Sequence, residues 1–64
     1  MRMLRIEIKT GGAAYADENE KVSYEGRFEL KRNLLKITED IISGSDEGSI
    51  MDINGNKVGT WSLN

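Results

Sequence analysis

The 64-residue chain contains no Cys, no His and no Pro, and this absence constrains its fold more than any residue that is present. A chain this short buries only about 60% of the surface that its unfolded form exposes, and its core supplies about 3–5 kcal/mol. Disulfides and zinc–thiolate clusters often stabilise such domains, but both need cysteine. The sequence therefore predicts a single small domain over residues 1–64, with oligomerisation as the remaining source of added stability.

The charge of the chain narrows the class of partner. Its formal net charge is -2, whereas binding to nucleic acid or to anionic membranes is dominated by clustered Lys and Arg. Residues 1–9 alternate charged and apolar side chains instead of forming the apolar run of a signal peptide. No segment approaches the ~20 apolar residues that span a bilayer. We therefore expect a cytoplasmic protein with no membrane association, and nucleic acid is not the expected partner.

Three stretches carry the patterns of regular secondary structure. Leu4, Ile6 and Ile8 alternate with charged residues, which predicts a strand with one buried face. Residues 11–23 are small, acidic and aperiodic, so we expect a loop, held to the body by Tyr15 or Tyr24. From about residue 24 to 43 the apolar spacing is helical. Gly44 follows as the expected C-terminal cap residue.

The predicted helix carries two apolar stripes. Leu30, Leu34, Ile37 and Ile41 form the expected core face. Phe28, Leu35 and Ile42 recur one heptad apart beside it and form an extra core, a homodimer seam or a docking surface for a partner. We favour the homodimer seam, so a homodimer is expected. The solvent face is expected to hold the polar residues, with helix-spaced pairs Glu29–Arg32 and Lys36–Asp40; this face comprises Glu25, Glu29, Arg32, Asn33, Lys36, Glu39 and Asp40.

Residues 49–61 predict a β-hairpin around Asn54–Gly55. A type I turn with a glycine bulge sets Asp52 opposite Asn56 and Ile50 opposite Val58, whereas a tight two-residue turn sets Ile50 opposite Gly59. We prefer the bulged register. Val58 and Trp61 cannot point to the same face of a regular strand, so a further irregularity is expected at Gly59.

The element order strand, helix, hairpin predicts an α+β fold of β-α-β-β type. The expected architecture is a three-stranded antiparallel sheet with the last strand in the middle and one helix packed on one face. The other face of the sheet is expected to be exposed, with Trp61 as a further candidate for it. The residues expected there are Arg5, Glu7, Lys9, Met51, Ile53 and Lys57.

The residue types argue against catalysis and against a bound cofactor or metal. Without His or Cys, only a Lys could activate a Ser or Thr, and no Lys is expected to be buried. Asp52, Asn54 and Asn56 resemble a calcium loop, but Gly55 comes too early for one, so a turn role is expected. The acidic residues of the loops are expected to be solvated. Alternatively, they converge and imitate the phosphate spacing of a nucleic acid. These residues are Asp17, Glu18, Glu20, Asp46 and Glu47. We expect a non-enzyme without cofactors.

Trp61 is the most distinctive single residue. It is expected to be an aromatic residue in the core of the chain or of a dimer. Alternatively, it is an exposed platform on which the bases of a single-stranded nucleic acid stack, surrounded by Arg5, Lys9 and Lys57. Together with the second helix stripe it completes the candidate partner or dimer interface: Phe28, Leu35, Ile42 and Trp61.

The chain also resembles small uncharacterised proteins of phages, prophages and other mobile elements. The resemblance is carried by Ala13-Ala14-Tyr15, by the helix pattern from Glu29 to Ile41, and by the ending from Asp52 to Trp61. It implies a genomic setting in which small proteins bind and block a host protein.

Three function hypotheses follow. The first is a non-enzymatic inhibitor that acts stoichiometrically on a host protein, such as an anti-CRISPR or other anti-defence protein. The second is a nucleic-acid-binding accessory protein that uses the outer sheet face. The third is a purely structural homodimer.

Overall fold

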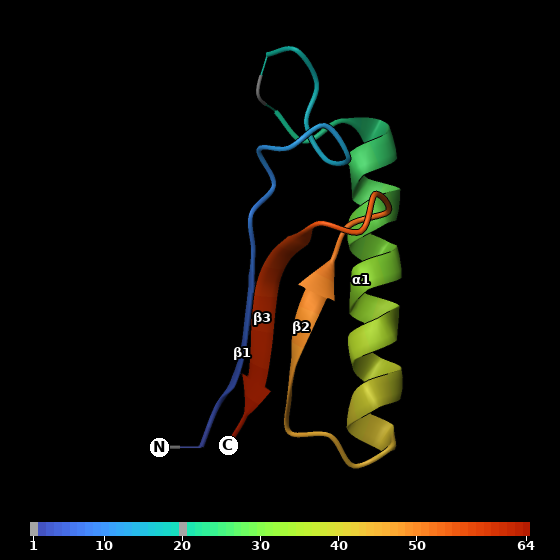
Figure 1. Ribbon diagram of the computed structural model, residues 1–64. Helices are drawn as coiled ribbons and strands as arrows, with labels where there is room; N and C mark the ends of the chain where they lie inside the picture. Colours follow the sequence, from blue (N-terminus) through green and yellow to red (C-terminus); the bar gives the residue numbers. More distant parts are fainter. Residues whose placement is uncertain (1, 20) are drawn as a thin grey trace.

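The computed structural model describes residues 2–19 and 21–64 and has one open three-stranded sheet and one helix. Its elements are β1 (Leu4–Ile8), α1 (Tyr24–Ile42), β2 (Glu47–Met51) and β3 (Lys57–Leu63). β3 is the middle strand and pairs antiparallel with β1 on one side and β2 on the other (Figure 1). The predicted α+β fold with β-α-β-β order is confirmed.

Trp61 lies at the centre of the core. Its side chain is 2% exposed and packs with Ile37 of α1 and Ile50 of β2. Across the sheet, Trp61 is opposite Ile6 of β1 and Gly48 of β2. A Cβ atom on residue 48 would lie 2.6 Å from the indole Nε1, so the glycine leaves the space that the large ring fills. Half-buried apolar side chains complete the core: Ile6, Ile8, Ile41 and Val58.

The hairpin combines both predicted registers. At its tip the Asp52 amide donates to the Asn56 carbonyl over 2.8 Å, and Gly55 has φ of +83°, as the glycine-bulge turn requires. The register then shifts, so that Ile50 lies opposite Gly59 and not opposite Val58 as predicted. Val58 is the extra, unpaired residue of this bulge, and it therefore packs on the core together with Trp61, which a regular strand forbids.

Both ends of α1 are capped by the residues that the sequence supplies. The Ser23 hydroxyl accepts a hydrogen bond from the Gly26 amide over 2.9 Å, and the helix begins at Tyr24, as predicted. After the last helical residue, Gly44 adopts φ of +101°, and the Ser45 amide donates to the Asp40 carbonyl. This is the glycine-terminated helix end that the sequence predicts.

The face that α1 turns to the body differs from the predicted one. Its buried residues are Gly26, Glu29, Asn33 and Ile37. Leu34, which we expected in the core, is 45% exposed, whereas Glu29 and Asn33, which we expected in solvent, are 8% and 3% exposed. The helix is therefore rotated toward its polar side, and the reason lies in the groups that these two polar residues bind.

Asn33 joins the loop after β1 to the hairpin. The Tyr15 hydroxyl donates to Asn33 Oδ1 over 2.8 Å, and Asn33 Nδ2 donates to the Met51 carbonyl over 3.1 Å. Tyr15 is fully buried, and burial raises the pKa of its hydroxyl, which keeps its proton at neutral pH and remains a donor. Of the two tyrosines proposed as loop anchors, Tyr15 has that role, since Tyr24 is 72% exposed.

Glu29 fastens the hairpin tip to the helix. Its Oε2 accepts a hydrogen bond from the Ile53 amide over 2.8 Å, and its Oε1 accepts one from the Arg32 guanidinium. The same guanidinium donates to the Met51 carbonyl over 3.0 Å. The predicted Glu29–Arg32 pair thus exists, but it bridges the helix to the hairpin instead of lying in solvent. Lys36 and Asp40 form the other predicted pair over 2.7 Å.

The tip of the hairpin is closed by its own polar side chains. Asp52 Oδ1 accepts hydrogen bonds from the amides of Asn54 and Asn56 over 2.9 and 2.8 Å. The bond from the Asn56 amide is the main cause of a lowered pKa at Asp52. Asp52 and Asn56 therefore have the turn role that the sequence predicts. In the described part of the chain, no helix has both the length and the apolar character needed to cross a membrane.

Substitution of Gly26 by Ala is expected to destabilise the protein, although Ala is ordinarily the better helix former by about 1 kcal/mol. A Cβ at this position would lie 1.9 Å from the Tyr15 carbonyl oxygen, so helix and loop must separate. We expect a loss of at least about 1–3 kcal/mol of unfolding free energy in urea denaturation.

Gly11→Ala is the matched control, because nothing lies within 4 Å of a Cβ there. A Gly26→Ala protein as stable as the Gly11→Ala protein would contradict this packing.

Glu29→Ala is expected to release the hairpin tip. The Ile53 amide loses a charged acceptor, and hydrogen bonds of this kind contribute about 1.5–3 kcal/mol. Hydrogen exchange followed by NMR is expected to show the Ile53 amide exchanging at least about tenfold faster. Glu25→Ala removes the same charge from an exposed position one turn earlier and is expected to leave that rate unchanged. An unchanged exchange rate of the Ile53 amide in Glu29→Ala would refute this hydrogen bond between the helix and the hairpin tip.

Candidate protein-binding surface

The far side of α1 is an apolar stripe. We define the outer stripe as Tyr24, Phe28, Leu35 and Ile42, which are 72%, 55%, 54% and 81% exposed. At about 100° per residue, Leu35 lies about 160° around the helix from the buried Ile37. The sequence placed three of these residues beside the core face; because the helix is rotated, the stripe instead points away from the core.

At the N-terminal end of the stripe two aromatic rings pack together, and the apolar surface is wider there. The rings of Tyr24 and Phe28 meet edge to face, with centroids 5.1 Å apart and an interplanar angle of 82°. A shallow depression next to Phe28 is lined in part by Ala14 and Ile53. Ile53 is 73% exposed, and its amide is held by Glu29. This hydrogen bond therefore places an exposed apolar residue of the hairpin beside the helix, whereas we had expected Ile53 on the outer sheet face.

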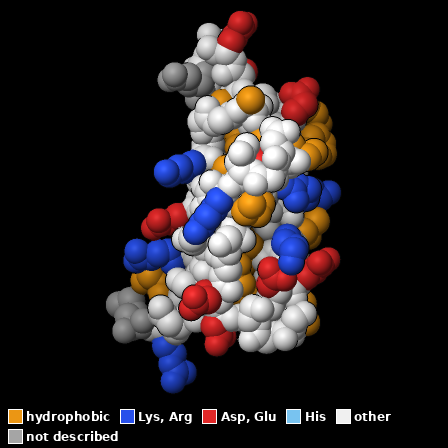
Figure 2. Space-filling model, in the orientation of Figure 1, with side chains coloured by type: hydrophobic (Ala, Val, Ile, Leu, Met, Phe, Trp, Pro, Cys, Tyr) orange, Lys and Arg blue, Asp and Glu red, His pale blue; other side chains and the backbone are white. Residues whose placement is uncertain are grey.

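The exposed apolar area of this side is large for so small a protein. Leu34, 45% exposed, borders the stripe. With the stripe and Ile53 it brings to six the large apolar side chains on this side of the molecule that are between 45% and 81% exposed. Figure 2 shows hydrophobic side chains along the right margin of the molecule, on the side of α1 in Figure 1. Such an area is typical of an interaction surface.

Trp61 does not belong to this surface. We named it with Phe28, Leu35 and Ile42 as a partner or dimer interface residue, but it points inward from the middle strand and is 2% exposed. The three helix residues share one exposed face, and Trp61 lies across the core from them. Its placement also removes the stacking residue from the outer sheet face, because the residues beside it that point outward are Thr60 and Ser62.

The acidic residues do not form one cluster. Asp17 and Glu18 lie in the loop before α1, and Asp46 and Glu47 lie at the start of β2, which is at the opposite end of the molecule (Figure 1). Glu20 lies outside the described residues. Within residues 2–19 and 21–64, no group of three or more Asp or Glu side chains is placed to hold a metal ion. Convergent imitation of phosphate spacing is therefore not supported.

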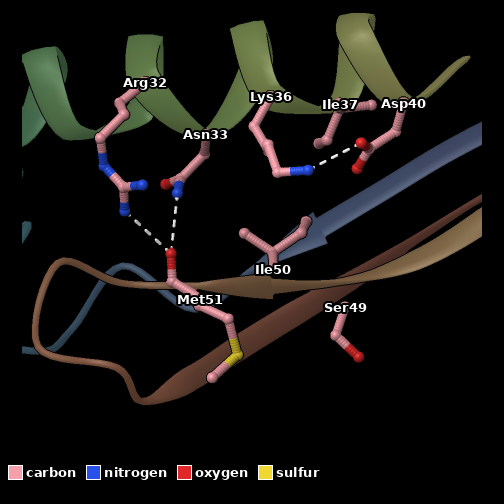
Figure 3. Close-up of a pocket in the computed structure, with 8 residues that line it drawn as sticks. All are labelled: Arg32, Asn33, Lys36, Ile37, Asp40, Ser49, Ile50 and Met51. Carbon is pink, nitrogen blue, oxygen red and sulfur yellow. Dashed lines mark hydrogen bonds and ion pairs between the residues drawn. The ribbon is translucent and has the colours of Figure 1, made fainter. Parts of the chain in front are cut away.

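A cleft lies between α1 and β2, but it is a poor ligand site (Figure 3). Its volume is about 130 Å³, below the roughly 300–1,000 Å³ of small-molecule sites. Its polar groups also bind one another: Arg32 and Asn33 both donate to the Met51 carbonyl, and Lys36 pairs with Asp40. The cleft is best described as part of the contact between helix and hairpin.

Comparisons with known proteins do not add to this geometry. No family model matches the chain, and neither the curated proteins nor the solved structures contain a significant match.

Proposed function

We propose that this chain is a non-enzymatic protein that binds one protein partner through the outer stripe of α1. The observation that carries the proposal is the exposure of four large apolar side chains on the helix face opposite the core. They add little to the fold where they stand, since the core is formed by Ile37, Ile50 and Trp61 on the other side. Their burial by a partner would provide the affinity.

The geometry fits a helix that docks into a groove. Phe28, Leu35 and Ile42 are spaced at i, i+7 and i+14, and Tyr24 adds a fourth anchor one turn before Phe28. An amphipathic helix that binds in this mode lays such anchors into a hydrophobic groove of its partner. Arg27 and Lys31 flank the stripe on one side, so a groove with an acidic rim on that side is the complementary partner.

The mode of action follows from this docking. A preformed helix fixed to a small sheet loses little conformational entropy when it binds, which favours tight stoichiometric binding. Occupying a groove would block any other helix that uses it. The anti-defence role and the mobile-element setting rest on the sequence resemblance, and a cytoplasmic location rests on the composition of the chain.

A second copy of the chain is the alternative occupant of the stripe. In that case α1 of one protomer would pack on α1 of the other, and the chain would be the structural homodimer of our third hypothesis. The effect of a stripe substitution on the mass of the protein in solution separates the two occupants.

The first test is light scattering on the wild type and on Leu35→Asp. If the stripe binds a different protein, this substitution leaves the mass and the helical circular dichroism of the protein unchanged, because Leu35 faces solvent. A wild-type dimer that becomes a folded monomer in Leu35→Asp would instead identify the stripe as a homodimer seam and overturn the proposal.

The second test identifies the partner through the stripe itself. A photo-crosslinking residue at position 35 is expected to capture one protein that a crosslinker at position 57 of β3 does not capture. The purified partner is then titrated calorimetrically, with an expected stoichiometry of one per helix. Leu35→Asp is expected to weaken binding at least about tenfold, and Met51→Asp, an apolar-to-acidic change at a similarly exposed site elsewhere, is expected to have little effect. Equal effects of the two substitutions would contradict the proposal.

A further inference from the structure

β1 has an open edge. The strand order β1-β3-β2 gives it one neighbour, and within the described residues no other segment pairs with its far side. Figure 1 shows β1 on the side of the sheet that lies away from α1. An exposed edge of this kind is a template for pairing with another strand.

The backbone groups on this edge belong to Leu4, Ile6 and Ile8. Met3 and Asn64 exchange both of their backbone hydrogen bonds, at 3.0 and 3.1 Å, and the Lys9 amide donates to the Val58 carbonyl over 2.8 Å. Bonding direction alternates along an antiparallel strand. The odd-numbered residues therefore bond to β3, and the N–H and C=O groups of the even-numbered residues point outward.

The opposite edge of the sheet is protected at its Met51 end. The Met51 carbonyl on the free side of β2 accepts hydrogen bonds from Arg32 and Asn33, and α1 runs beside this strand (Figure 3). Helix coverage is a common protection for sheet edges. Since α1 binds the Met51 end of the β2 edge and leaves β1 open, the two edges of this sheet are not equivalent.

The side chains of β1 favour a second β1 strand in one register. When two copies run antiparallel with Ile6 opposite Ile6 of the other protomer, Leu4 lies opposite Ile8, and Arg5 lies opposite Glu7 twice by symmetry. Opposite charges in such positions stabilise a strand pair and like charges destabilise it. The neighbouring registers that keep the same bonding groups place either Arg5 or Glu7 opposite itself.

We propose that two copies of this chain associate through β1 in that register and form a continuous six-stranded antiparallel sheet. Arg5 and Glu7 are free to do this, because their pair within the strand is long, at 3.8 Å, and both side chains are largely exposed. On the inner face, Leu4, 47% exposed in one protomer, gains the partner subunit's Ile8 as an apolar neighbour. The two-fold arrangement is closed, so association stops at the dimer.

The dimer is separate from the proposed function and compatible with it. A two-fold axis perpendicular to the sheet leaves both helices on the same face, and α1 lies at the β2 side of each protomer, away from the new seam. The two outer stripes therefore stay free. Pairing also supplies the oligomeric stabilisation that a 64-residue chain without cysteine can use.

A charge-reversal cycle tests the seam and its register by analytical ultracentrifugation. Arg5→Glu places Glu opposite Glu7, and Glu7→Arg places Arg opposite Arg5, so each single variant is expected to weaken dimerisation at least about tenfold. The double variant Arg5→Glu/Glu7→Arg restores opposite charges and is expected to restore the wild-type dissociation constant. Both side chains are exposed, so the variants are expected to keep the wild-type circular dichroism.

Amide hydrogen exchange provides an independent measurement. The amides of Leu4, Ile6 and Ile8 are expected to become slower to exchange as protein concentration rises. The amide of Ser49, which faces outward on the other edge, is expected not to change. A wild-type protein that remains monomeric at millimolar concentration, or a dimer that the single reversals leave intact, would overturn the proposal. Leu35→Asp is expected to leave this dimer unaffected, which separates its failure from that of the helix-face function.

Discussion

The hydrogen-bonded series from the Tyr15 hydroxyl through the Asn33 amide to the Met51 carbonyl is the interaction on which the rest of the structure depends. It joins the loop after β1, the helix and the hairpin in the interior. A buried amide without these partners would cost about 1–3 kcal/mol, a large part of the stability of so small a domain. Keeping Asn33 inside fixes the rotation of α1, and that rotation decides which apolar residues are left in solvent.

Much of the fold could be predicted from local signals in the sequence. The alternation around Ile6, the helical spacing around Ile37 and the turn chemistry at Gly55 each depend on neighbours within a few residues. The order of elements then leaves few ways to arrange three strands and one helix. These features are confirmed, including the C-terminal cap of α1 at Gly44 and the bulged tip of the hairpin.

The errors arise where a residue's role depends on a distant partner. Glu29 and Asn33 look like solvent residues on a helical projection, because nothing local reveals that the Ile53 amide and the Tyr15 hydroxyl lie against them. Gly26 was the available signal: a glycine inside a helix lowers its stability, and its position against the Tyr15 carbonyl explains its presence. The exposed set Phe28, Leu35 and Ile42 was found by spacing, but Trp61 was misassigned to it, since one strand residue fits either face until the register is known.

The separation of the outer stripe from the core also has an evolutionary consequence. Tyr24 and Ile42 are largely exposed in the protomer, and substitutions at such positions usually change stability by no more than about 0.5 kcal/mol. The stripe can therefore vary in sequence with little cost to folding, whereas the buried Tyr15 and Asn33 cannot. A domain divided in this way can acquire a new binding specificity in a few substitutions, because each intermediate along the path still folds.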